Sequence, residues 1–323
     1  MATHTRPARS TGVLVKALDW NPAKLLQPLH ASHNIGEGQS GDLPSRFALI
    51  ILNQPLADNF DLLKVLWDHA CLRVAADGGA NRLYEIAGKH GDSSFDELDV
   101  IIGDLDSLTD DTRRYYETRP VPSGSTPTQI IRNPDQESTD FGKAVYHIRS
   151  WHREQQQKSQ GNNDGTPLDI VAIGGLGGRV DQALSQIHHL YLFQAGGVEE
   201  DDEEGQVPAE QRSTYDAGRV YLVSSHSLTF LLRRGRHRIR VREVGEAEAG
   251  IPSVFGKHVG ILPIGEPSRI TTRGLEWDVT DLLTRFGGRV STSNHILPET
   301  EVVEVETTRD VVWTMALNRV EGG

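Results

Sequence analysis

The 323-residue chain is poor in cysteine, methionine and aromatic residues, and it has no long apolar run. Its single cysteine, Cys71, excludes an internal disulfide framework and favours a reducing compartment, so we expect a cytoplasmic protein. The most apolar stretches, such as residues 47–52, have the length of a strand and fall far short of the roughly 18 residues that a membrane span needs. We therefore expect no membrane partner.

Positive charge is also scarce, since 33 Lys and Arg residues face 45 Asp and Glu residues and leave a net charge of −12. This balance argues against a nonspecific nucleic-acid binder, which needs a basic face. Six consecutive acids at 199–204 supply half of that charge and indicate a solvated segment. The remainder is only mildly acidic, so an anionic substrate such as a nucleotide would need local cations or a metal ion.

The pattern along the chain predicts two domains, as the length also suggests. Residues 1–45 are rich in Gly, Ser, Pro and His and form a partly disordered extension. Residues 46–196 alternate strand-like and helix-like runs, which is typical of an α/β domain with a doubly wound, mostly parallel sheet. Residues 197–218 form an acidic flexible linker, and the short β-rich runs of 219–323 predict a C-terminal β-sandwich.

Aspartates and glycines follow three predicted strands at the point where each ends. Asp77-Gly78-Gly79 follows strand 72–76, Asp104 and Asp106 follow strand 99–102, and a Gly-rich turn at 174–178 follows strand 168–173. Ligands of open α/β sheets bind beyond the carboxyl ends of the strands. Two carboxylates at i and i+2 of a loop can converge on Mg²⁺, whose remaining ligands are often substrate phosphates. The sequence therefore favours a metal–phosphate site over the alternatives of an Asp-Gly turn and helix caps.

Two further segments add candidate phosphate contacts. In the Gly-rich turn, Gly175 and Gly178 would let the backbone approach a phosphate and Arg179 would clamp it, although a tight strand-to-helix turn explains the glycines equally well. Asp140 and Lys143 lie three residues apart at the start of predicted helix 139–157. Either the two residues form an ordinary ion pair, or Asp140 faces a metal ion or a hydroxyl group and Lys143 faces a phosphate.

These segments resemble the thiamin pyrophosphokinase family, from about residue 47 to residue 317. The matching segments occur in the family's order across both predicted domains, namely 77–81, 103–107, 135–143, 174–182, 262–265, 272–277, 286–287, 291–294 and 312–315. Departures are mild: Leu105 and Val180 stand where the family commonly has Phe, and Glu137 stands where it often has Asp.

The resemblance implies a homodimer whose active site forms between subunits, with ATP and thiamin as substrates and Mg²⁺ as the cofactor. Carried over by position, the acids around Mg²⁺ and the catalytic centre are Asp77, Asp104, Asp106 and Asp140. The residues that line the nucleotide and phosphates are Gln136, Lys143, Gly175, Gly178, Arg179 and Asp181. The thiamin contacts are Trp277, Ser291, Ser293 and Asn294. Without the resemblance, core packing would explain Trp277 and a hairpin turn would explain 291–294.

The reaction that follows is Mg²⁺-dependent transfer of a diphosphoryl group from ATP to the thiamin hydroxyl, which releases AMP. One alternative is another Mg²⁺-dependent phosphoryl or nucleotidyl transferase with a different alcohol acceptor. A second is a thiamin- or nucleotide-binding protein without turnover, and the acids present at every matched motif argue against it. A third, an interaction module built on the acidic run, is the weakest.

Overall fold

The computed structural model describes residues 17–26, 46–56, 60–91, 93–120, 126–158, 166–194, 215, 217–243 and 253–318. Most of the predicted N-terminal extension and residues 197–214 of the predicted linker, with the acidic run 199–204, lie outside these ranges. Within them, no helix combines the length and the apolar character that crossing a membrane requires.

A ten-stranded sheet runs through the molecule, and six of its strands form a parallel half with the order β7-β6-β2-β3-β4-β5. These strands are β2 (Phe47–Ile51), β3 (Leu72–Ala76), β4 (Val100–Gly103), β5 (Gln129–Arg132), β6 (Asp169–Ile173) and β7 (Val220–Val223). The helices between them are α1 (Phe60–His69), α2 (Gly79–His90), α3 (Asp110–Thr118), α4 (Asp140–Lys158) and α5 (Val180–Gln194), with a short 3-10 helix η4 (Ser93–Asp96) after α2.

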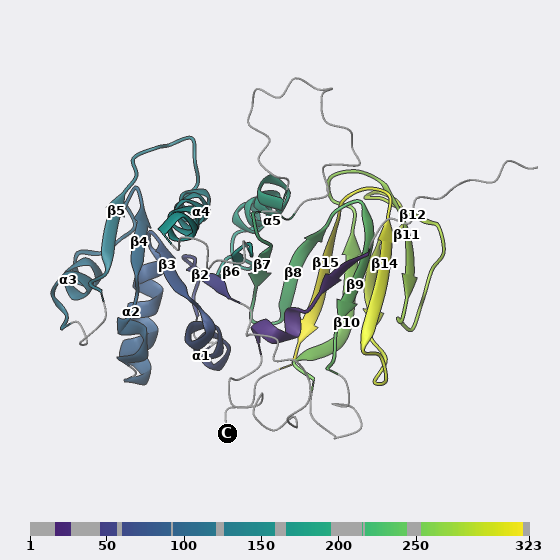
Figure 1. Ribbon diagram of the computed structural model, residues 1–323, viewed down its shortest axis with the longest axis horizontal. Helices are drawn as coiled ribbons and strands as arrows, with labels where there is room; N and C mark the ends of the chain where they lie inside the picture. The colour runs from purple at the N-terminus through teal and green to yellow at the C-terminus, as the bar shows by residue number, and fades with distance from the viewer. Residues whose placement is uncertain are drawn as a thin grey trace, which may run out of the picture.

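Helices cover both faces of this parallel half (Figure 1). In β2, Phe47, Leu49 and Ile51 share a core with α1, α2 and α3, whereas Ala48 and Ile50 share a second core with α4 and α5. Successive side chains of a strand point to opposite faces, so a strand with apolar residues at every position must be buried on both. The predicted doubly wound sheet is confirmed.

The other four strands of the large sheet are antiparallel, and a second sheet of five strands packs on them. The large sheet continues from β7 through β8 (Ser227–Leu232), β15 (Val311–Leu317), β10 (Phe255–Leu262) and β13 (Ser291–His295). The small sheet has the order β1 (Leu18–Trp20), β9 (Gly235–Arg240), β14 (Val302–Thr307), β11 (Ser268–Arg273) and β12 (Leu282–Thr284). The predicted β-rich second region is thus confirmed as two facing sheets.

Two details differ from the sequence-based grouping of strands. Strand β7, grouped with the second domain, pairs in parallel with β6 and carries the large sheet from one half into the other. Strand β1, from the predicted extension, pairs in parallel with β9, and the 3-10 helix η1 (Pro22–Leu25) follows it. The ring of Trp20 stacks on Phe230 at 4.5 Å, and its Nε1 donates a hydrogen bond to His237 Nδ1 at 3.0 Å. This buried anchor explains why part of the extension is folded.

Candidate active site

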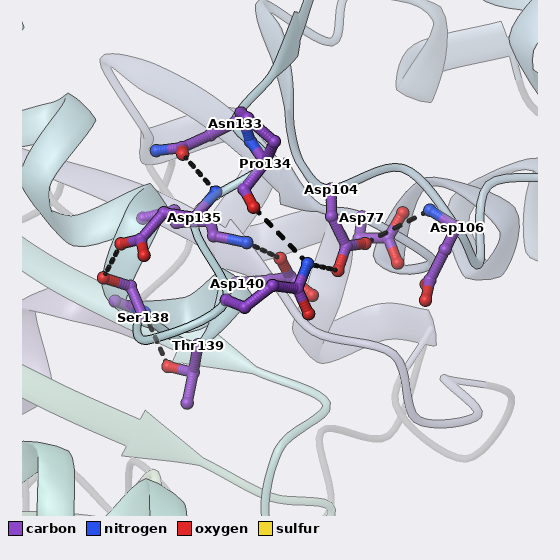
Figure 2. Close-up of polar contacts among 12 residues, drawn as sticks. Asp77, Asp104, Asp106, Asn133, Pro134, Asp135, Ser138, Thr139 and Asp140 are labelled. Atoms are coloured by element: carbon purple, nitrogen blue, oxygen red, sulfur yellow. Dashed lines mark hydrogen bonds and ion pairs between the residues drawn. The ribbon is translucent and has the colours of Figure 1, made fainter.

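Four aspartates meet at the carboxyl edge of the parallel half (Figure 2). Asp77 directly follows β3, Asp104 and Asp106 follow the neighbouring strand β4, and Asp140 begins α4 after β5. Carboxylate oxygens of Asp77, Asp104 and Asp106 lie within 4.8 Å of one another. Parallel strands deliver their following residues to one edge, so the topology itself produces this cluster of like charges.

Asp77 is the buried member of the cluster, with a relative exposure of 4%. Its Oδ2 accepts a hydrogen bond from the backbone N–H of Ser107 at 3.2 Å, whereas its buried Oδ1 has no hydrogen-bond partner among the residues that the structure describes. Burial raises the pKa of Asp77, and the nearby charges of Asp140 and Asp104 raise it further. A buried carboxylate oxygen without a partner costs stability, and that cost points to a ligand absent from the isolated chain.

The pKa of Asp104 is shifted in the direction opposite to that of Asp77. The backbone N–H of Asp106 donates to its Oδ1 at 3.2 Å, and this hydrogen bond lowers the pKa of Asp104. The pair does not cap the following helix, because Thr109 caps α3 and its hydroxyl accepts the N–H of Thr112. The helix-cap alternative for these acids is therefore wrong.

The backbone around the cluster permits the close approach of the acids. A Cβ on Gly103 would lie 2.7 Å from Cβ of Asp77 and 3.0 Å from Oδ1 of Asp140, so only glycine fits there. Asp77 and Leu105 both have positive φ, at 45° and 65°, although neither is glycine. Such strained backbone is concentrated at functional sites, where it aims side chains.

At the start of α4, Asp140 is paired with Lys143, whose side chain is almost fully buried and whose Nζ lies 3.2 Å from Asp140 Oδ1. The ordinary ion pair considered from the sequence is therefore present, and a phosphate contact of Lys143 stays a prediction. Gln136 lies at the rim, with its Nε2 3.5 Å from Oδ2 of Asp104.

The Gly-rich turn lies at the topological switch point of the parallel half. There β6 pairs with β2 on the side away from β3, so the strand order reverses. Gly178 has a φ of 63°, and a Cβ there would lie 2.7 Å from Oε1 of Gln54, in the loop after β2. A Cβ on Gly175 would lie 2.6 Å from Leu52 Cδ1. Nucleotides bind at such a topological switch point in doubly wound sheets. The tight packing of the two glycines is also expected of an ordinary strand-to-helix turn, the alternative interpretation of this segment.

Arg179 and Asp181, at the start of α5, are exposed and paired with each other. Arg179 Nε donates to Asp181 Oδ1 at 3.1 Å, and its NH2 group contacts Oδ2. The pair stands at the end of the Gly-rich turn and on the solvent side, where an incoming phosphate could exchange for the carboxylate.

The four predicted thiamin contacts gather at one edge of the sandwich. Trp277 is 53% exposed, so it is not a core residue. Its backbone is held by buried Asn294, whose Nδ2 donates to Trp277 O at 2.9 Å and whose Oδ1 accepts the N–H of Trp277 at 3.2 Å. Ser291 and Ser293 lie on edge strand β13, and Ser293 has a φ of 57° beside an irregularity in its pairing with β10. The hairpin-turn alternative for 291–294 is therefore wrong.

Comparisons with known proteins decide the family. Residues 63–199 match the family described as "Thiamin pyrophosphokinase, catalytic domain", and residues 236–312 match "Thiamin pyrophosphokinase, vitamin B1 binding domain". The chain is 34% identical over 285 residues to thiamine pyrophosphokinase 2 of Arabidopsis thaliana, a match that covers 85% of this chain and 88% of that protein. The chain belongs to the thiamin pyrophosphokinase family.

Other members of the family agree in sequence and fold. Thiamine pyrophosphokinase 3 of Oryza sativa is 33% identical over 281 residues, 84% of this chain and 87% of that protein. The crystal structure of yeast thiamin pyrophosphokinase superposes with a TM-score of 0.69 at 25% identity and covers 95% of this chain and 93% of that chain. The fold of the Candida albicans thiamin pyrophosphokinase superposes with a TM-score of 0.66 at 23% identity, covering 94% and 93% of the two chains.

The family's two matched regions each contain one of the two clusters, because the four acids lie within 63–199 and Trp277 and Asn294 lie within 236–312.

Two neighbours of these clusters are not predicted by the sequence motifs. Asn53 follows β2 at the same edge as the acids and accepts a hydrogen bond from Arg82 Nε at 2.9 Å, so the rule that found the acids also applies to it. His295 covers part of Trp277 with 4.7 Å between ring centroids, and no spacing rule predicts that contact.

Proposed function

We propose that this member of the thiamin pyrophosphokinase family transfers the diphosphoryl group of ATP to the hydroxyl of thiamin in a Mg²⁺-dependent reaction, giving thiamin diphosphate and AMP. The observation that carries the proposal is the cluster of Asp77, Asp104 and Asp106 at the sheet edge, with a buried, unpartnered oxygen on Asp77. The family match of both halves of the chain supports thiamin as the acceptor.

The donor set fits Mg²⁺, which prefers carboxylate oxygens and completes its shell with water and phosphate. Asp77, Asp104 and Asp106 would hold the ion, and Asp140 stands beside them. When bound, Mg²⁺ neutralises charge on the phosphates and orients them. The unpartnered Oδ1 of Asp77 would gain a partner from such a ligand.

The bonds of the proposed reaction balance without any further reactant. A bond forms between the thiamin hydroxyl oxygen and the β-phosphorus of ATP, while the bond from that phosphorus to the oxygen it shares with the α-phosphorus breaks. AMP leaves with the bridging oxygen, and a carboxylate of the cluster accepts the hydroxyl proton. Lys143 and Arg179 supply positive charge near the phosphates, and Gln136, Gly175, Gly178 and Asp181 line the nucleotide side.

Thiamin would bind on the exposed indole of Trp277. The thiazolium ring is cationic, and an indole face attracts a cation. Ser291 and Ser293 offer donors and acceptors to the aminopyrimidine ring, and Asn294 holds the backbone of Trp277. The acids and Trp277 belong to different halves of the chain, so we propose that a homodimer completes each active site between subunits, as the resemblance implies.

Asp106→Asn tests the role of the acids. We expect turnover to fall by about a hundredfold or more, because a metal ligand is lost, while the fold stays intact. Asp111→Asn, an exposed acid paired with Arg114 on α3, is the matched control and keeps its activity. Turnover of Asp106→Asn close to the unsubstituted rate would remove Asp106 from the site. A panel of alcohol acceptors with Mg-ATP separates the proposed acceptor from others.

A further inference from the structure

Thr139 links the first turn of α4 to helix α5. Its Oγ1 accepts a hydrogen bond from the backbone N–H of Gly142 at 3.0 Å, so Thr139 caps α4. The same Oγ1 lies 2.7 Å from Nε2 of His189, on α5. Nδ1 of His189 lies 2.6 Å from the backbone O of Ser185. One chain of hydrogen bonds thus runs from α5 to the residue before Asp140.

The chemistry of the partners fixes the direction of these bonds. A carbonyl oxygen only accepts, so Nδ1 of His189 carries the hydrogen that is donated to Ser185. Nε2 of the neutral ring then accepts, and the hydroxyl of Thr139 donates to it. The Thr139 oxygen keeps its lone pairs for the N–H of Gly142, so both bonds of the cap are satisfied at once.

The environment of His189 keeps its ring neutral and in place. The residue is 4% exposed, and its ring packs against Phe141 and Phe193 with centroid distances of 5.2 Å to each. Burial lowers the pKa of His189. A neutral, enclosed imidazole with both nitrogens bonded is a rigid element of the packing.

This series of hydrogen bonds ends beside the acid cluster. Asp140 follows Thr139 directly, and Figure 2 shows the two residues side by side. The carboxylate of Asp140 stands against Gly103 and contributes to the field at Asp77. Helix α5 itself begins just after the Gly-rich turn. The bond between His189 and Thr139 therefore joins the start of α4, beside the acids, to the later part of α5, the helix that follows the Gly-rich turn.

We propose that His189 is a positioning residue for the acid cluster, which acts through the Thr139 cap to hold Asp140 and the first turn of α4 in register with α5. The proposal rests on the function proposed above, because it assigns His189 a part in aligning that reaction. His189 touches no reacting atom, and its effect passes through the hydroxyl of Thr139.

The chain offers a matched control in His237. That residue is 1% exposed, and both of its ring nitrogens are bonded, one to Trp20 Nε1 and the other to Arg233 O. It lies on β9 within the sandwich rather than beside the acids. His237→Leu removes an equally buried imidazole and so measures the general cost of that loss.

The test compares steady-state kinetics of thiamin-dependent AMP formation for His189→Leu, Thr139→Val, the double variant, Thr139→Ser and His237→Leu. We expect kcat to fall about tenfold in both single variants, with KM for thiamin changed by less than about twofold. The double variant falls no further, because one interaction is lost in all three. Thr139→Ser keeps the hydroxyl and the rate, and His237→Leu loses thermal stability but keeps kcat.

Amide hydrogen exchange supplies a readout that does not depend on activity. The first turn of α4 should exchange faster in His189→Leu and Thr139→Val, but not in His237→Leu. An unchanged kcat in His189→Leu, losses that multiply in the double variant, or an equal kcat loss in His237→Leu would overturn the proposal. If the unsubstituted protein forms no AMP, the proposed function fails, and exchange at α4 alone decides whether His189 holds this turn. Thr139 is exposed, so Thr139→Val carries the test if His189→Leu does not fold.

Discussion

Asp77→Asn should make the metal-free protein more stable and inactive at the same time. The substitution is mild for the backbone, because asparagine tolerates the positive φ of 45° found at this position. The amide oxygen can still accept the N–H of Ser107. What changes is the charge of a buried carboxylate whose Oδ1 has no partner in the described part of the chain.

The distances in the cluster set the size of the effect. Oxygens of Asp77, Asp104 and Asp106 lie within 4.8 Å of one another. Two unit charges at that separation repel by about 1 kcal/mol in water and by about 3 kcal/mol at an effective dielectric constant of 20. Asp104 is partly exposed and Asp106 is exposed, so the value in water applies to each pair. Asp77→Asn removes two such repulsions, so we expect a gain of about 2 kcal/mol and a rise in Tm of about 2–4 °C without metal.

Thermal unfolding with and without Mg²⁺ measures the change in stability, and turnover measures the loss of activity. Mg²⁺ should raise the Tm of the unsubstituted protein and should leave Asp77→Asn almost unchanged, because ligand binding stabilises only the state that binds. Turnover of the variant should fall by about a hundredfold or more. A variant that is less stable than the unsubstituted protein, and that Mg²⁺ stabilises equally well, would refute the reasoning and make Asp77 a structural residue.

Two further predictions concern the sandwich. Trp277→Ala should raise KM for thiamin about tenfold and KM for ATP much less, with Trp277→Phe in between, since a cation binds a smaller ring more weakly; equal changes in both KM values would contradict a thiamin contact. Burial lowers the pKa of His237 to about 4, so the folded state takes up its proton less readily than the unfolded chain. Stability should therefore fall as the pH drops from about 6.5 to about 4, by up to about 3 kcal/mol, and His237→Gln should flatten that slope in denaturant titrations.

Much of the parallel half could be predicted from the sequence, because its local signals agree with its tertiary packing. The helix expected at 139–157 is α4 at Asp140–Lys158, with Thr139 as its cap. Strands β2, β3 and β6 also lie where the apolar runs 47–52, 72–76 and 168–173 predict. Asp77 and the Asp104–Asp106 pair could be located as well, because ligands of such sheets bind beyond the carboxyl ends of the strands and these acids directly follow β3 and β4.

Of the remaining features, strand β13 and the bond between Thr139 and His189 depend on contacts that no local pattern records, whereas strand β7 has a local signal. Strand β13 has the polar sequence Ser-Thr-Ser-Asn-His, and an edge strand of this kind shows no apolar alternation. Strand β7 is buried at all four positions, which is typical of a parallel strand, and this signal could have placed it beside β6. The bond between Thr139 and His189 joins residues 50 positions apart, so only the folded chain reveals it.

The most direct measurement for the central claim is the stoichiometry of AMP and thiamin diphosphate formed by the purified protein from Mg-ATP, with and without thiamin. The account predicts that AMP forms only when thiamin is present, in an amount equal to thiamin diphosphate, and that a chelator of divalent cations stops both. AMP that forms without thiamin would contradict the assignment of the acceptor. Thiamin binding without any AMP would contradict the assignment of the acid cluster as a catalytic centre.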